Sequence, residues 1–294
     1  MKPTSLIFLV LSAVLLFGGM ITCSVAETMA KSQDTSIFEQ VKDKNGDYVY
    51  KYSLTDEKLS KLELSFTDVN VKVIGSANES YEELKNYDPY GYSTTLSGTT
   101  VTVDGNASGL SSIIDLSGGG LRFKGLRYFF AGSFGEGRER SVNVYISENC
   151  DVSSINIKVV NGNISFANLY NNVDYNVNVD NGNVTFDTVV TESVINLDIT
   201  SGEANIVNSE SASFGIVSTT SKVTLDLTRY AHEFINYNVK TEEESQLVHN
   251  GSLDDDGQMK VSVSSDLQKC LVKIDASSSE VIILDNSVSI TPTP

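Results

Sequence analysis

The sequence predicts an all-β fold, namely a single-stranded parallel β-solenoid that follows an N-terminal apolar helix. Three observations predict it. The composition favours strands and turns, because Val, Ile, Thr and Asn recur throughout while Trp is absent and Pro numbers four. Apolar residues alternate with a period of two along much of the chain. A unit of about twenty residues also repeats, which is typical of a stacked, coil-by-coil architecture.

The N-terminal segment, residues 1–26, predicts a membrane anchor. No charge lies between Lys2 and Glu27, and residues 6–17 are strongly apolar. About twenty apolar residues can span a bilayer as a helix, whereas a cleaved signal peptide with a site near residues 24–26 is the alternative and would make the protein secreted. Because the positive charge of Lys2 precedes the apolar run, both interpretations place the rest of the chain outside the cytoplasm. A single-pass membrane protein with an extracytoplasmic C-terminal domain is therefore expected.

The segments after the anchor are predicted in order. Residues 27–45 are polar and predict a linker, and residues 46–294 predict the solenoid ectodomain. Residues 47–52 alternate and predict the first strand. Residues 79–91 predict a loop or one helical turn.

The repeat is clearest from residue 156 to residue 225. Copies begin at Asn156, Asn176 and Asn196, and a degenerate fourth copy begins at Gly215. Alternation places one side chain in two on a buried face. Like residues recur in four columns: Ile157, Val177, Leu197 and Ile216; Val159, Val179, Ile199 and Ser218; Ile164, Val184, Ala204 and Val223; Phe166, Phe186, Ile206 and Leu225.

Two architectures fit the turn at the centre of each copy. Asn161-Gly162 and Asn181-Gly182 are strong turn signals, and such pairs also mark β-hairpins, which would give an antiparallel β-sandwich. The solenoid is favoured because stacked coils require matched residues in every column, whereas a meander does not. Stacked amides in the column of Asn156, Asn176 and Asn196 can also form a hydrogen-bonded ladder.

The pattern extends beyond the clear copies. Alternating segments occur at residues 62–73, 96–103, 142–146 and 272–283. If the units stack in chain order at about 4.8 Å per coil, Cys150 and Cys270 lie about six coils apart. A disulfide requires Cα atoms within about 7 Å, so we expect both thiols to be free.

These segments resemble a family of bacterial cell-envelope proteins with β-solenoid repeats, often called "putative adhesins". The similar features are residues 64–73, the strand at residues 141–146, and the Asn-Gly copies from Asn156 onward. The resemblance covers roughly residues 60–285. It implies a right-handed β-helix, and it carries over no site residues, since its motifs are structural.

Residues 105–140 break the repeat and predict a loop that binds a partner. The loop combines aromatic and basic side chains in a chain whose net charge is −17. Aromatic residues and arginine are enriched in interaction hot spots, although a capping role with solvated arginines is the alternative. The candidate partner-binding residues are Arg122, Lys124, Arg127, Tyr128, Phe129 and Phe130.

No catalytic, cofactor or metal motif is predicted. The two histidines, His232 and His249, lack a nucleophile motif and are expected at the surface, and residues 254–257 fail the calcium-loop pattern. The acidic chain disfavours nucleic acid. We expect a non-catalytic envelope protein that binds the membrane through its N-terminal helix and an unidentified protein or glycan through its solenoid. The alternatives are a glycan-active enzyme on a β-helix and an extracytoplasmic partner of a membrane signalling system.

Overall fold

The computed structural model describes residues 39–42, 48–53, 60–76, 80–85, 92–97, 99–105, 114–115, 122–123, 141–147, 151–230, 234–242, 244–254, 258–261 and 268–286. All elements of these residues are β-strands, and most pair in parallel. Within these ranges, no helix is long and apolar enough to cross a membrane. The predicted anchor at residues 1–26 lies outside them, so the anchor, its helix and the location of the protein stay predictions.

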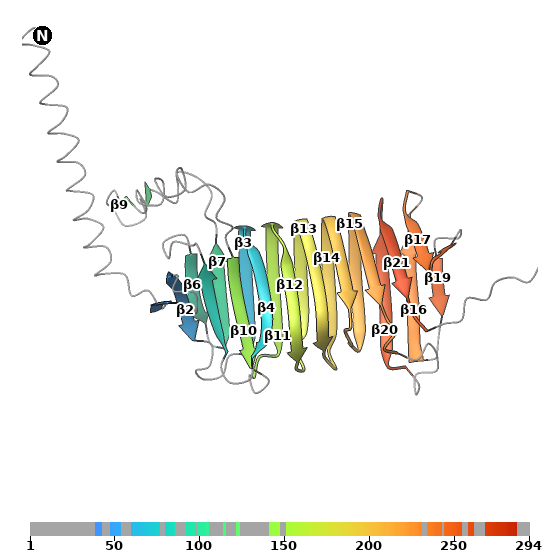
Figure 1. Ribbon diagram of the computed structural model, residues 1–294. Helices are drawn as coiled ribbons and strands as arrows, with labels where there is room; N and C mark the ends of the chain where they lie inside the picture. Colours follow the sequence, from blue (N-terminus) through green and yellow to red (C-terminus); the bar gives the residue numbers. More distant parts are fainter. Residues whose placement is uncertain are drawn as a thin grey trace, which may run out of the picture.

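The strands form a rod with two faces joined into one continuous sheet (Figure 1). The first face contains only parallel neighbours. Its strands, in stacking order, are β7 (Thr100–Gly105), β3 (Lys61–Asp68), β11 (Ser154–Asn161), the first halves of β13 (Asp174–Val190), β14 (Val194–Val207) and β15 (Ser213–Asp226), then β20 (Cys270–Ala276) and β16 (Ile235–Thr241).

The second face follows the same stacking order and is also parallel. Each strand of the first face except β7 continues into it after a turn. Its strands are β10 (Ser141–Ser147), β4 (Asn70–Ser76), β12 (Ile164–Tyr170), the second halves of β13, β14 and β15, then β21 (Glu280–Leu284) and β17 (Gln246–His249).

The register confirms the predicted stacking of the central copies. Val159 lies beside Val179 on parallel neighbouring strands, and Ile164 lies beside Val184. The antiparallel sandwich is therefore wrong, because its strands would alternate in direction. The handedness implied by the family resemblance stays a prediction.

The interior between the two faces is filled by the predicted columns. Phe166 and Phe186 stack with ring centroids 4.3 Å apart, and Tyr175 packs edge-on against both rings. Each fully buried Val, Leu, Ile or Phe side chain contributes about 1.5–3 kcal/mol. Tyr175 also donates its hydroxyl to Asn171 Oδ1 at 2.6 Å, and its burial raises the pKa of the phenol. The buried hydroxyl thus keeps a partner.

The turn between the faces explains the Asn-Gly pairs. Gly182 has φ +153°, and a Cβ there would lie 1.8 Å from the carbonyl oxygen of Gly162 in the preceding coil. Only glycine fits such a close approach of two backbones. The neighbouring amides form a ladder, since Asn181 Nδ2 donates to Asn161 Oδ1 at 3.3 Å and Asn161 Nδ2 donates to Asp68 Oδ1 at 2.9 Å.

The stacking order at both ends differs from the order predicted. Strands β3 and β4 stack between β7 and β10 on one side and β11 and β12 on the other, although they precede all four in sequence. In the same way, β20 and β21 lie between β15 and the earlier strands β16 and β17. Chain order therefore holds only from β11 to β15. Cys270, at the start of β20, is free and buried, and Cys150 lies outside the described residues.

Antiparallel strands flank the parallel coils at both ends. Residues 92–105 form a hairpin of β6 (Tyr92–Ser97) and β7 and not a coil, and β5 (Tyr81–Lys85) is a strand within residues 79–91, where a loop or helical turn was predicted. The remaining antiparallel strands are β1 (Glu39–Lys42), which lies within the predicted linker, β2 (Tyr48–Ser53), β8 (Ile114–Asp115), β9 (Arg122–Phe123), β18 (Ser252–Asp254) and β19 (Gln258–Val261).

Candidate ligand groove

The predicted partner-binding loop is mostly outside the described residues. Arg122 lies in β9, opposite Asp115 of β8. Lys124, Arg127, Tyr128, Phe129 and Phe130 lie outside the described residues, so a role for this loop stays a prediction.

A groove of about 850 Å³ runs along the outer surface of the first face. Its lining comes from all eight strands of that face, from β7 at one end to β16 at the other. The floor is the backbone of residues such as Ile157 and Val177, whose side chains are buried in the core. The groove therefore follows the axis of the rod and crosses one coil after another.

Two rows of outward-facing side chains form the sides of the groove. They lie one residue before and one residue after the buried floor column, because successive side chains of a strand point to opposite faces. The amide row is Thr102, Glu63, Asn156, Asn176, Asn196, Gly215, Lys273 and Asn238; the mixed row is Asp104, Ser65, Lys158, Asn178, Asp198, Val217, Asp275 and Lys240.

The amide row is a continuous hydrogen-bonded ladder through its centre. Asn196 Nδ2 donates to Asn176 Oδ1 at 2.8 Å, and Asn176 Nδ2 donates to Asn156 Oδ1 at 2.9 Å. This confirms the ladder predicted from the asparagine column. The ladder ends at Gly215, where a Cβ would lie 2.5 Å from Asn196 Oδ1. A larger residue at position 215 would therefore displace the last amide.

The other end of the ladder is anionic. Thr102 Oγ1 donates to Glu63 Oε2 at 3.2 Å, and the Lys61 ammonium lies 2.7 Å from Glu63 Oε1. The hydrogen bond from Lys61 is the main reason that the pKa of Glu63 is lowered, and its charge and bonds from Thr102 and Asn156 act in the same direction. Glu63 is thus ionised at neutral pH and held in place by its neighbours.

The groove is nearly balanced in charge. Its lining contains three lysines, at positions 158, 240 and 273, and four carboxylates, at positions 63, 104, 198 and 275. Within the mixed row, Asn178 Nδ2 donates to Asp198 Oδ2 at 3.1 Å. The part of the chain that the structure describes holds no cluster of three or more metal-ligating side chains. The central coils thus offer a ligand four amides, one lysine and one carboxylate.

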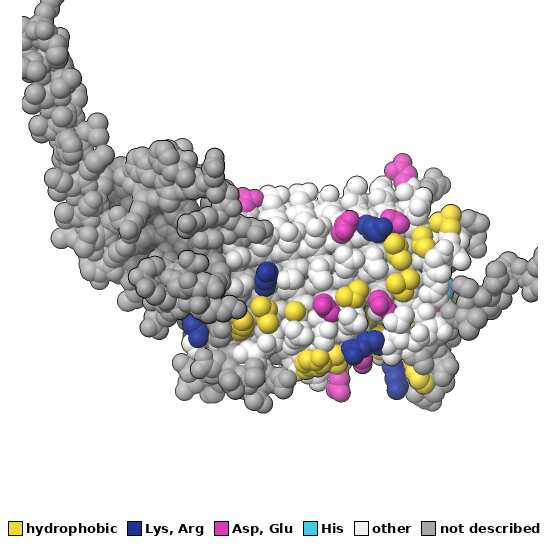
Figure 2. Space-filling view, in the orientation of Figure 1, with side chains coloured by type: hydrophobic (Ala, Val, Ile, Leu, Met, Phe, Trp, Pro, Cys, Tyr) yellow, Lys and Arg dark blue, Asp and Glu magenta, His cyan; other side chains and the backbone are white. Residues whose placement is uncertain are grey.

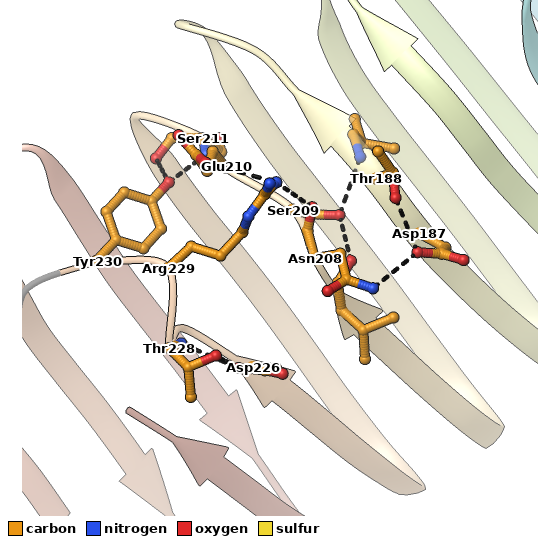
Figure 3. A network of polar contacts seen from close by, with 12 residues as sticks. Asp187, Thr188, Asn208, Ser209, Glu210, Ser211, Asp226, Thr228, Arg229 and Tyr230 are labelled. Atoms are coloured by element: carbon orange, nitrogen blue, oxygen red, sulfur yellow. Dashed lines mark hydrogen bonds and ion pairs between the residues drawn. The ribbon is translucent and has the colours of Figure 1, made fainter. Parts of the chain in front are cut away.

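A second polar network lies at the corner where the second-face strands end (Figure 3). Asn208 Nδ2 donates to Asp187 Oδ1 at 3.1 Å, Arg229 Nη1 donates to the carbonyl of Asn208 at 2.7 Å, and Arg229 also pairs with Glu210 at 3.5 Å. The Tyr230 hydroxyl donates to the carbonyl of Ser211 at 2.8 Å. Because these bonds join one coil to the next, we assign the residues of this corner a structural role and not a binding role.

The face of the rod seen in Figure 2 offers no large patch of one kind. Most of its surface is uncharged polar side chain and backbone, with small hydrophobic groups and single acidic or basic side chains between them. The groove, by contrast, is lined by eight neighbouring strands. The twenty-residue period and strand alternation place Lys158, Asn178 and Asp198 in one outward column, but such a column gives no sign that the surface is hollowed there.

The fold and the groove define the class: a parallel β-solenoid whose surface carries a lengthwise groove of repeated polar side chains. Residues 59–288 match the Toastrack DUF4097 family, and the chain belongs to this family. The resemblance predicted from the repeats is thereby confirmed. Among curated proteins, no sequence matches the chain.

Several solved structures are similar to the chain at low sequence identity. A "putative cell adhesion protein" from Clostridium sporogenes is 13% identical with a TM-score of 0.43, over 81% of this chain and 99% of that one. A "putative adhesin" from Bacteroides fragilis is 12% identical with a TM-score of 0.36, over 81% and 96%. A "putative adhesin" from Parabacteroides merdae is 13% identical with a TM-score of 0.31, over 80% and 95%.

Proposed function

We propose that this chain is a non-catalytic binding protein of the cell envelope, of adhesin type, whose ligand lies in the groove of the first face. The observation that carries the proposal is the groove itself, which continues across eight strands with its two side-chain rows in register. A site of this shape fits an extended ligand that lies parallel to the rod. The N-terminal anchor predicted from residues 1–26 would hold the rod at the membrane, outside the cytoplasm.

The side chains of the central coils support binding rather than catalysis. A glycosidase of the usual kind uses two carboxylates that face each other across the scissile bond, about 5–9.5 Å apart. In the central coils, the mixed row instead places Lys158, Asn178 and Asp198 in succession, and Asn178 is hydrogen-bonded to Asp198. Asp198 is thus the single carboxylate of those three coils in this row, and it already accepts a bond from its neighbour.

The experiment that tests the proposal blocks the groove. Two long side chains are introduced two coils apart by N178R together with V217R, since Val217 is 50% exposed in the mixed row. The matched control is N205R, on the outer side of the second face in β14. Binding of the full chain, in mild detergent, to isolated envelope polymers is measured by co-sedimentation. We expect the double variant to lose at least about ninety per cent of the bound protein, and the control to bind as the unmodified chain does, since blocking a contact worth about 1.4 kcal/mol already weakens binding tenfold.

Two results would contradict the proposal. Equal binding by the double variant and the control would place the ligand elsewhere, with the loop at residues 105–140 as the first alternative. Release of reducing ends from the polymers during the incubation would show glycan cleavage and replace the binding role by an enzyme.

A further inference from the structure

The central coils present one asparagine each at a constant spacing in the amide row, while the residue in the mixed row changes from coil to coil. From β11 to β14 the two rows offer the pairs Asn156 with Lys158, Asn176 with Asn178, and Asn196 with Asp198. Parallel strands are spaced at about 4.8 Å, so each coil repeats the site after this distance. A row of equivalent amides fits a ligand whose own units repeat, with one unit facing each coil.

The ladder leaves a donor and an acceptor for a ligand on its central amide, Asn176. At Asn156 the amide oxygen also accepts Ser154 Oγ at 3.1 Å, so this amide offers a ligand no further lone pair. A side-chain amide has two N–H donors and two acceptor lone pairs. In the ladder, Asn176 uses one donor on Asn156 and one lone pair for Asn196, which leaves one donor and one acceptor. Because the ladder bonds fix the rotamers, these groups are preorganised, and binding requires little further loss of side-chain entropy. A donor and an acceptor on one amide suit a pair of neighbouring hydroxyl groups, each of which both donates and accepts.

The geometry disfavours a peptide that binds as an added strand. Strand addition needs an exposed sheet edge with unpaired backbone groups. The floor strands β11, β13, β14 and β15 each have a parallel neighbour on both sides, so their backbone groups are engaged within the sheet. A ligand in the groove is therefore recognised through side chains.

The charge balance disfavours a strongly charged polymer. Three lysines face four carboxylates along the lining, although the whole chain has a net charge of −17. A polyanion would meet the acidic protein without a matching basic surface, and a polycation attracted by the chain's net charge would meet three lysines among the four carboxylates of the groove. A neutral polymer rich in hydroxyl groups encounters neither penalty.

We propose that the groove binds a neutral linear polysaccharide, with successive sugar residues facing successive coils. The hydroxyl groups bond to the amide row at Asn156, Asn176 and Asn196, and to Asn178 and Asp198 on the other side. This inference rests on the proposed function, because it names the chemical class of the ligand for the same groove. Since every coil contributes a similar small number of bonds, affinity grows with ligand length until the ligand spans the ladder.

The test uses oligosaccharide series of increasing length as probes. Cello-oligosaccharides and chito-oligosaccharides are the neutral probes, oligogalacturonates are the anionic probe, and an unfolded peptide of mixed composition is the third. The full chain in mild detergent is titrated with each by isothermal calorimetry. We expect the neutral series to bind with an affinity that rises with length, and the N176A–N178A double variant to weaken the longest member by roughly tenfold or more. The control N205A removes an amide from the second face and leaves the affinity unchanged.

The outcomes separate this inference from the proposed function. Binding of the anionic or peptide probe alone, lost in N176A–N178A, would overturn the neutral polysaccharide and keep the groove as the binding site. Binding of the neutral series that is equal in the double variant and the control would overturn both. If no neutral series binds, the inference is overturned. The proposed function would still stand if the co-sedimentation experiment showed binding to envelope polymers that N178R with V217R abolishes. The melting temperature of N176A–N178A is compared with that of the unmodified chain. If the double variant is unstable, N178A alone repeats the comparison, because Asn178 is a proposed sugar contact outside the ladder.

Discussion

The centre and the ends of the rod stack by different rules. From β11 to β15 the coils follow chain order, and each coil repeats the residues of the one before it. At each end, one coil is inserted between two that are adjacent in chain order. The difference teaches that matched columns determine which coils can pack against each other. Where several coils match, as at the ends, their stacking order depends on the path of the connecting segments.

Short antiparallel strands cover the outer coil at the C-terminal end of the rod. The last described strand of the second face by sequence, β21, is paired with β15 on one side and β17 on the other. The outer strands β16 and β17 in turn pair with the antiparallel strands β19 and β18. Exposed parallel edges invite pairing with another chain, so these short antiparallel strands reduce the length of open edge. The two regions should therefore respond differently to substitutions.

The largest effect is expected at the central turn. In G182A, the new Cβ would lie 1.8 Å from the carbonyl oxygen of Gly162, at a φ of +153° that L-residues rarely adopt. The two coils would have to separate, so we expect a loss of about 3 kcal/mol or more in the free energy of unfolding. Chemical denaturation followed by circular dichroism measures it.

The matched control for this substitution is G251A at the C-terminal end. Gly251 has φ +81°, but a Cβ there meets no atom within 4 Å. Strain without a clash should cost about 1 kcal/mol. Equal losses of unfolding free energy in G182A and G251A would contradict the prediction, because they would show that the close approach of the two backbones at Gly182 adds nothing to the cost of strain.

The sequence predicted the centre well because its evidence is local and repeated. Val159 and Val179 occupy equivalent places in adjacent copies, so their contact follows from the period alone. At the ends the period gives no such evidence. Val272 and Ile274 would match the columns of any coil, so the sequence does not show that β20 lies between β15 and β16. The groove was missed for a similar reason. Asn178 and Asp198 could be placed in an outward column, but a hollow surface depends on how the side chains of eight strands lie together.

The next effect is expected at the C-terminal end, where one carboxylate joins two coils. Asp285 is 7% exposed and accepts the Tyr237 hydroxyl at 2.6 Å and Asn250 Nδ2 at 2.8 Å, and His249 Nε2 lies 3.1 Å away. Burial, followed by this carboxylate, raises the pKa of the Tyr237 phenol, which therefore stays protonated and donates. His249, which was expected at the surface, thus belongs to a partly buried cluster.

Removing this carboxylate should loosen the outer coil alone. In D285A the hydroxyl of Tyr237, which is 2% exposed, would lose its acceptor, at a cost of about 2 kcal/mol. Because each coil of a solenoid contacts only its neighbours, hydrogen exchange should accelerate in residues 235–249 and stay slow in residues 174–207. D275A removes an exposed carboxylate from the same region as a control. Faster exchange throughout the rod would show that the ends and the centre unfold as one unit.

The smallest effect is a gain of stability at the second corner of the centre. Asn168, Thr188 and Asn208 occupy equivalent places in three coils, with φ values of 55°, 60° and 51°. This left-handed conformation is tolerated by asparagine and disfavoured for a β-branched side chain. T188N should therefore stabilise the chain by about 0.5–1 kcal/mol and raise the melting temperature by roughly 2 °C. T185N, in the extended part of the same strand, should lower it slightly because asparagine is a poorer strand residue. A melting temperature of T188N at or below that of T185N would contradict this prediction. It would show that the left-handed conformation of Thr188 does not lower the stability of the central coils.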